Sequence, residues 1–185
     1  MPVGSYDDGK EAFVYNAGFR FPGVTIAKGS SISSATLTVI PIETIGTFNT
    51  VLRGVDEDNF SGWSSSVRPS TITATSAWTE WDDDTAWTLY VAKVSPNFSG
   101  LVEEIVGRSG WASGNALGIA LINQGSGMQF RSIAFYEHAT YDPPQLNITY
   151  TESGYVPSKI SEGLAIAMAE SGKGLGIFIC EPGVG

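Results

Sequence analysis

Apolar and polar residues alternate along many short segments of the chain, and clusters of Gly, Pro, Ser and Asn separate one segment from the next. Alternation with a period of two places the apolar side chains on one face, so it predicts half-buried β-strands. In the clearest segment, residues 32–43, Leu37 and Val39 alternate with threonines. The pattern predicts eight strands, at residues 19–24, 32–43, 50–55, 76–81, 87–91, 116–122, 130–136 and 145–150.

One segment carries a helical pattern instead. In residues 99–107 the apolar side chains Leu101, Val102, Ile105 and Val106 recur at one-turn spacing, and the two carboxylates between them face away. This spacing predicts a short helix. Eight strands is the number found in a jelly roll. The pattern therefore predicts an all-β, two-sheet jelly-roll sandwich in which the short helix covers one edge.

The character of the chain changes after Tyr150. We therefore predict a jelly-roll domain at residues 1–150 and a C-terminal extension at residues 151–185. Within the extension, Gly-Leu-Ala-Ile-Ala-Met at 163–168 is echoed by Gly-Leu-Gly-Ile-Phe-Ile at 174–179. Two such segments joined by a polar turn predict a β-hairpin.

The predicted hairpin is apolar and needs cover. A two-stranded hairpin is marginal alone in water and an exposed apolar one aggregates, so it must pair with the main domain or with another chain. We favour another chain, which predicts a homo-oligomer. The predicted assembly interface consists of Leu164, Ile166, Met168, Leu175, Ile177, Phe178 and Ile179.

Length and charge limit the possible functions. The 185 residues suffice for one domain with a short extension. A formal net charge of −9 repels phosphates and anionic lipids, so neither nucleic acid nor a membrane is an expected partner. The first residues lack the pattern of a secretion signal, and we expect no export by that route. Cys180 is the only cysteine, which excludes an internal disulfide and favours a buried thiol.

The sequence offers few residues for catalysis. His138 is the only histidine, so a triad or a histidine-rich metal site would depend on it alone, and we expect a structural or solvated side chain. The acidic runs that begin at Asp56 and Asp82 fall in predicted loops. Carboxylates in loops are usually solvated rather than paired for glycoside hydrolysis. We therefore predict that the protein is not an enzyme.

The first acidic run contains the one candidate metal site. Asp56, Asp58 and Asn59 have an alternate spacing that lets several oxygens converge in a loop, and calcium prefers such ligands. The twelve-residue calcium loop with its fixed glycine and closing glutamate is absent. Calcium is therefore predicted only from this spacing, and we expect no other cofactor.

Five tryptophans are available for packing or for stacking on a ligand. Trp78 and Trp81 are three residues apart, so in a strand they point to opposite faces, one into the core and one outward. We expect most tryptophans in the core, with Trp111 filling the sandwich after the helix. Trp63, in a Ser-Gly-Trp-Ser loop, is the best candidate for exposure and for ligand binding.

Several runs together resemble a known family. Residues 19–37 (Phe-Arg-Phe-Pro-Gly-Val-Thr-Ile-Ala-Lys-Gly-Ser-Ser-Ile-Ser-Ser-Ala-Thr-Leu) are similar to the opening of the DNRLRE-type jelly-roll modules. Further matching pieces lie at residues 78–81, 101–117, 131–137 and 144–150, so the resemblance covers roughly residues 7–150. It implies a β-sandwich that binds carbohydrate in some members and builds phage particles and surface proteins in others.

Two functions follow as expectations. The first is a non-catalytic virion structural protein of a bacteriophage, such as a capsid decoration (cement) protein or a tail component. Its partners would be capsid or tail subunits, and it would assemble in the host cytoplasm. The motive is the acidic sandwich with an apolar extension that must pair. The alternative is a carbohydrate-binding module whose partners are glycans.

Overall fold

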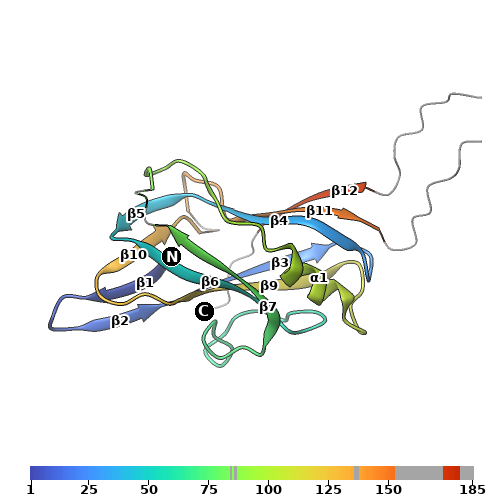
Figure 1. Cartoon of the computed structure of the whole chain (residues 1–185), viewed down its shortest axis with the longest axis horizontal. Helices are drawn as coiled ribbons and strands as arrows, with labels where there is room; N and C mark the ends of the chain where they lie inside the picture. Colours follow the sequence, from blue (N-terminus) through green and yellow to red (C-terminus); the bar gives the residue numbers. More distant parts are fainter. Residues whose placement is uncertain (84, 86, 136–137, 153–172, 180–185) are drawn as a thin grey trace, which may run out of the picture.

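The computed structural model describes residues 1–83, 85, 87–135, 138–152 and 173–179 (Figure 1). For residues 173–179 only the backbone is described. In chain order the elements are β1 (Pro2–Asp7), β2 (Ala12–Tyr15), β3 (Ala17–Val24), β4 (Ser31–Val39), β5 (Pro41–Ile45), β6 (Phe48–Val55), β7 (Ala74–Asp83), β8 (Lys93–Val94), α1 (Ser99–Gly107), β9 (Asn115–Asn123), β10 (Gln129–Ile133), β11 (Gln145–Thr151) and β12 (Lys173–Ile179).

The strands form three antiparallel sheets of four strands each, in the orders β3-β9-β6-β7, β12-β11-β4-β8 and β2-β1-β10-β5. The first two sheets lie along the two faces of the sandwich, and the third lies at the end where β4 is followed by β5 (Figure 1). One hydrophobic core runs through all three, because Val3, Phe19 and Leu37 from the three sheets belong to it and are fully buried. The prediction of an all-β sandwich is confirmed.

Alternation places the core correctly in most strands. In β4 the residues Ile32, Leu37 and Val39 are buried, and in β3 both Phe19 and Phe21 are buried. The inward face of such a strand loses its contact with water, at roughly 25 cal/mol for each Å² of apolar surface. This burial is the main force that holds the two faces together.

Two strand predictions need correction, and other strands were not predicted. The expected strand at residues 32–43 is divided at Ile40 into β4 and β5, which pair in different sheets. The expected strand at residues 87–91 is not a strand, and Trp87 is buried there because its ring packs against Phe48 at 4.7 Å. β1 and β2 were not predicted. β2 has the sequence Ala-Phe-Val-Tyr, which does not alternate, and it is mostly exposed.

Helix α1 bridges the edges of the two main sheets. The residues expected to face the core, Leu101, Val102, Ile105 and Val106, are buried, which confirms the helical prediction. The helix contacts β7 and β6 in one sheet and β4 in the other. Gly54 lets the helix approach β6 closely, because an added Cβ there would lie 2.7 Å from Leu101 Cδ2. Within the described residues no helix is both long and apolar enough to span a membrane.

The described part of the C-terminal extension adds a strand to the chain's own sheet. β12 pairs antiparallel with β11, from Gln145 opposite Ile179 to Thr151 opposite Lys173 (Figure 1). β12 therefore contains the strand that was predicted at residues 174–179. The other half of the predicted hairpin, with Leu164, Ile166 and Met168, lies outside the described residues, as does Cys180.

Candidate functional site

The outer face of β6 and β7 carries polar and aromatic side chains in matched rows. Alternate residues of each strand point away from the core, and the strand register sets them opposite one another. The rows are Arg53 opposite Trp78, Val51 opposite Glu80, and Asn49 opposite Asp82. Successive rows lie two residues apart, or about 7 Å along the strands. The three rows therefore span about 14 Å.

β9 completes this surface on the other side of β6. Ile122 lies opposite Val51, and Gln124 follows the strand, with its backbone N–H donating to the carbonyl of Asn49 at 3.0 Å. Together these side chains line a depression of about 400 Å³, here called the Trp78 groove, which consists of Asn49, Val51, Arg53, Trp78, Glu80, Asp82, Ile122 and Gln124. A volume of this size lies within the range of small-molecule pockets.

Trp78 is the aromatic platform of the groove. Its side chain is 49% exposed, whereas Trp81 is 2% exposed, which confirms that the two rings point to opposite faces of the strand. The guanidinium of Arg53 lies 5.9 Å from the centre of the Trp78 ring, within the range of a cation–π contact. The spacing of Trp78 and Trp81 predicts that one ring lies outside, but it does not determine which one.

The expectation that Trp63 is exposed is wrong. Trp63 is only 9% exposed and packs edge-on against Phe60 at 4.7 Å. Its ring fits a recess on the outer face of β3, where a Cβ added to Gly18 would lie 2.4 Å from the indole. The loop that carries Trp63 therefore folds back onto the sheet. Trp63 belongs to a second hydrophobic cluster on the outer face, together with Val55, Phe60 and Ala120, and Ile122 packs against this cluster. The Trp78 groove is the part of the outer face beside the cluster that stays open.

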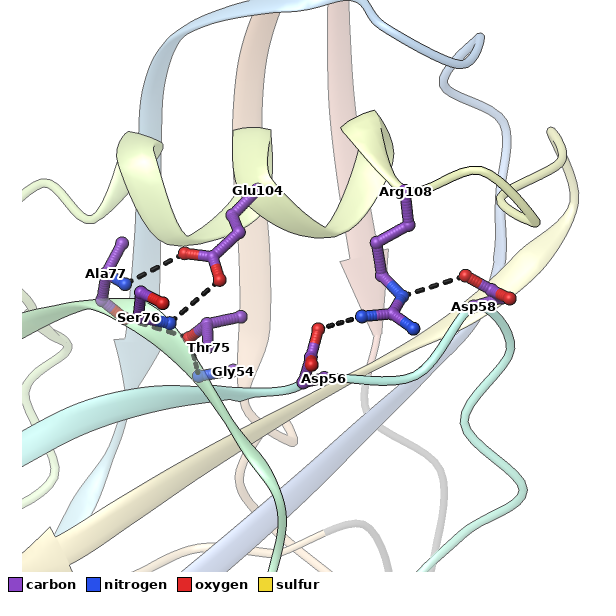
Figure 2. Close-up of polar contacts among 8 residues, drawn as sticks. All are labelled: Gly54, Asp56, Asp58, Thr75, Ser76, Ala77, Glu104 and Arg108. Carbon is purple, nitrogen blue, oxygen red and sulfur yellow. Dashed lines mark hydrogen bonds and ion pairs between the residues drawn. The ribbon is translucent and has the colours of Figure 1, made fainter.

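Polar contacts from α1 and from Thr75 within the sheet fix the Trp78 end of β7 (Figure 2). The carboxylate of Glu104 accepts hydrogen bonds from the backbone N–H groups of Ser76 and Ala77, each at 2.8 Å. The hydroxyl of Thr75 accepts the N–H of Gly54 at 3.1 Å and donates to the carbonyl of Ala77. The register between β6 and β7 shifts here, so these bonds satisfy backbone groups that leave the ladder. Trp78 is consequently held on a rigid strand.

Two of the calcium candidates, Asp56 and Asp58, are brought together, but around an arginine. Arg108 lies between the two loop carboxylates: its Nη1 pairs with Asp56 and its Nε donates to Asp58 at 2.8 Å (Figure 2). The side-chain oxygen of Asn59 accepts the N–H of Ala116 at 2.8 Å. Within the described residues no group of three or more His, Cys, Asp or Glu side chains is placed to hold a metal ion. This loop ties α1 to β6, and calcium binding there stays a prediction.

Asp82 and Asp83 of the second acidic run lie at the end of β7 and not in a loop. Asp82 faces the groove, and its Oδ1 accepts the backbone N–H of Thr50 at 3.2 Å. Asp83 faces the other way and accepts hydrogen bonds from Lys93, Thr85 and the indole N–H of Trp87. Burial alone would raise the pKa of Asp83, but these hydrogen bonds outweigh it and hold the pKa well below its usual range.

The shifted pKa of Asp83 predicts a loss of stability in acid. A carboxyl whose pKa is lower in the folded chain stabilises the fold above its unfolded pKa of about 3.9, and this contribution disappears as the pH falls through the folded value. We expect Asp83→Asn to lower the melting temperature at neutral pH. Below about pH 4 the melting temperature of this variant should fall less with decreasing pH than that of the unmodified protein. Thermal melts across this range test the effect, with Glu103→Gln as the matched control. An unchanged pH profile in Asp83→Asn would contradict the assignment.

His138 is placed as a structural residue. Its Nδ1 accepts the backbone N–H groups of Thr140 and Tyr141 at 3.3 and 3.2 Å, and its ring lies 5.1 Å from the ring of Tyr141. These contacts order a turn before β11.

Comparison with known proteins returned no similar sequence, family or structure. No protein-family model matches the chain, and no curated protein or solved structure matches it either.

Proposed function

We propose that the chain is a non-catalytic carbohydrate-binding β-sandwich module whose ligand lies in the Trp78 groove. The observation that carries this proposal is a half-exposed tryptophan set in an open groove among hydrogen-bonding side chains. The apolar face of a sugar ring can pack on the flat indole, and its hydroxyls can bond to the carboxylates and amides beside it. The resemblance to DNRLRE-type modules supports the same function.

The groove is built on hydrogen-bonded strands, which favours binding. Its lining side chains stand on β6, β7 and the end of β9, and the contacts of Glu104 and Thr75 fix the irregular end of β7. A site built on strands loses less conformational freedom on binding than a site built on loops. Sugars offer modest contact energies, so a preformed surface matters for them.

The placement of the carboxylates supports binding rather than hydrolysis. Glu80 and Asp82 stand two residues apart on the same face of β7 and approach a ligand from the same side. Glycosidases generally place two carboxyl groups on either side of the bond that breaks. The groove therefore offers carboxylates that accept hydrogen bonds from hydroxyls.

A glycan array tests the proposal directly. Labelled protein should bind a limited set of saccharides, and Trp78→Ala should remove that binding while the protein stays folded. Isothermal titration with the best saccharide should then give one site for each chain. A protein that is folded but binds none of the saccharides would overturn the proposal.

A second candidate function is assembly into a phage particle as a decoration protein or tail component. One observation favours it: β12 is the last strand of its sheet within the described part of the chain, so one backbone edge there has no described strand partner. Such an edge can accept a strand from another chain. Under this proposal the groove would be an accessory feature and the extension would form the contact.

Removal of the extension tests the assembly proposal. Under it, the full-length protein forms oligomers whose size grows with concentration, and a chain cut after Thr151 sediments as a monomer. Circular dichroism and a thermal melt show whether the shortened chain is folded. A full-length protein that stays monomeric at every concentration, or a folded shortened chain that assembles equally well, would refute the proposal.

A further inference from the structure

We infer that the Trp78 groove selects amino sugars, whose protonated amine pairs with Glu80 while the sugar ring stacks on Trp78. The inference rests on the proposed carbohydrate-binding function and adds a ligand class to it. It follows from the order of the charges along the groove. The cation Arg53 lies at the Trp78 end, and both carboxylates lie beyond it.

Among the residues that the structure describes, no cation is paired with either carboxylate. Within the described residues neither Glu80 nor Asp82 forms an ion pair, although Asp82 accepts the backbone N–H of Thr50. Glu80 is exposed and stands one row, or about 7 Å, from Trp78. A substituent on a ring that lies over the indole can reach this carboxylate. An ammonium group would form a charge-assisted hydrogen bond there.

The same arrangement disfavours acidic sugars. A uronate or sulfate that approaches the middle of the groove meets Glu80 and Asp82, and the whole chain adds a net charge of −9. Arg53 can attract an anion only at the Trp78 end, where its guanidinium already lies against the indole ring. Rejection by like charge is a common source of specificity in binding sites.

Four oligosaccharides of equal length test the inference by titration calorimetry in mildly acidic buffer, where the amine is protonated. These are a glucosamine oligomer, its N-acetylated form, a glucose oligomer and a galacturonate oligomer. We expect the glucosamine oligomer to bind at least ~10-fold more tightly than the glucose oligomer, which is the size of one favourable charged contact. The galacturonate oligomer should bind most weakly. Added salt should reduce the preference for the amine.

The variant Glu80→Gln isolates the charge from the shape of the side chain. It should reduce the ratio between the glucosamine and glucose affinities to near one, whereas Glu103→Gln on α1, away from the groove, should leave the ratio unchanged. Binding without preference for the amine, or tightest binding of the galacturonate oligomer, overturns the inference while the carbohydrate-binding proposal stands. Binding of no saccharide at all overturns both.

Discussion

Trp78→Ala is expected to weaken glycan binding by roughly 30- to 100-fold. Trp78 exposes 49% of its side chain, and a sugar stacked on it covers on the order of 100 Å² of the ring. At about 25 cal/mol for each Å², this burial contributes about 2.5 kcal/mol, which corresponds to a change of roughly 70-fold in affinity, within that range. Titration calorimetry with the best saccharide from the array measures the loss.

The control is a second exposed aromatic residue on a different sheet. Phe13 on β2 is 44% exposed and lies outside the groove, so Phe13→Ala should leave the glycan affinity unchanged. Trp78→Phe keeps a smaller ring and should retain part of the affinity. Equal losses in Trp78→Ala and Phe13→Ala would mean that the ligand does not lie in the groove.

The groove was not predicted from the sequence, although alternation along β6 and β7 contains its rows. Period two along β7 places Trp78, Glu80 and Asp82 on one face, and the same rule applied to β6 gives Asn49, Val51 and Arg53. The predicted strand ends at Trp81 and places Asp82 in a loop. The row that Asp82 forms with Asn49 is therefore absent from the prediction. The pairing that sets the two strands side by side is a long-range contact that no local pattern contains.

Other features depend on tertiary packing and leave no periodic signal. Trp63 has the sequence context of an exposed loop, yet it is buried because Gly18, far away in sequence, leaves space for the indole. Arg131 is fully buried on the inward face of β10, where alternation predicts an apolar residue. Its Nη1 donates to the carbonyl of Ile45 at 2.9 Å, and its guanidinium lies 5.3 Å from the centre of the Trp87 ring. Alternation alone cannot predict such a residue.

Glycan binding and assembly are proposed for two different surfaces of the sandwich. The groove lies on the sheet that contains β7, whereas β12 extends the opposite sheet. A module that holds a glycan on one sheet and a neighbouring copy on the other would bind a repetitive surface through many weak contacts at once. Linked sites of this kind can gain 10²- to 10⁴-fold in avidity by the usual estimate of ~mM effective concentrations.

Trp81→Ala should reduce the stability of the fold, whereas Trp78→Ala should reduce glycan affinity, although the two residues share a strand. Trp81 is 2% exposed, and its ring lies 5.4 Å from Phe48 and 5.3 Å from Trp87. Truncating a buried tryptophan costs about 3–5 kcal/mol, which lowers the melting temperature of a domain of this size by roughly 10–15 °C. Differential scanning calorimetry measures this loss.

The comparison between the two tryptophan variants separates folding from binding. Trp78→Ala should lower the free energy of unfolding by less than Trp81→Ala does, because half of Trp78 is already in water. Trp81→Ala, assayed well below its lowered melting temperature, should retain most of its glycan affinity because Trp81 faces the core. If Trp81→Ala loses affinity while folded, or Trp78→Ala melts as early as Trp81→Ala, the division of β7 into a binding face and a core face is wrong. The strand then carries both functions through the same side chains, and the groove is not an independent site.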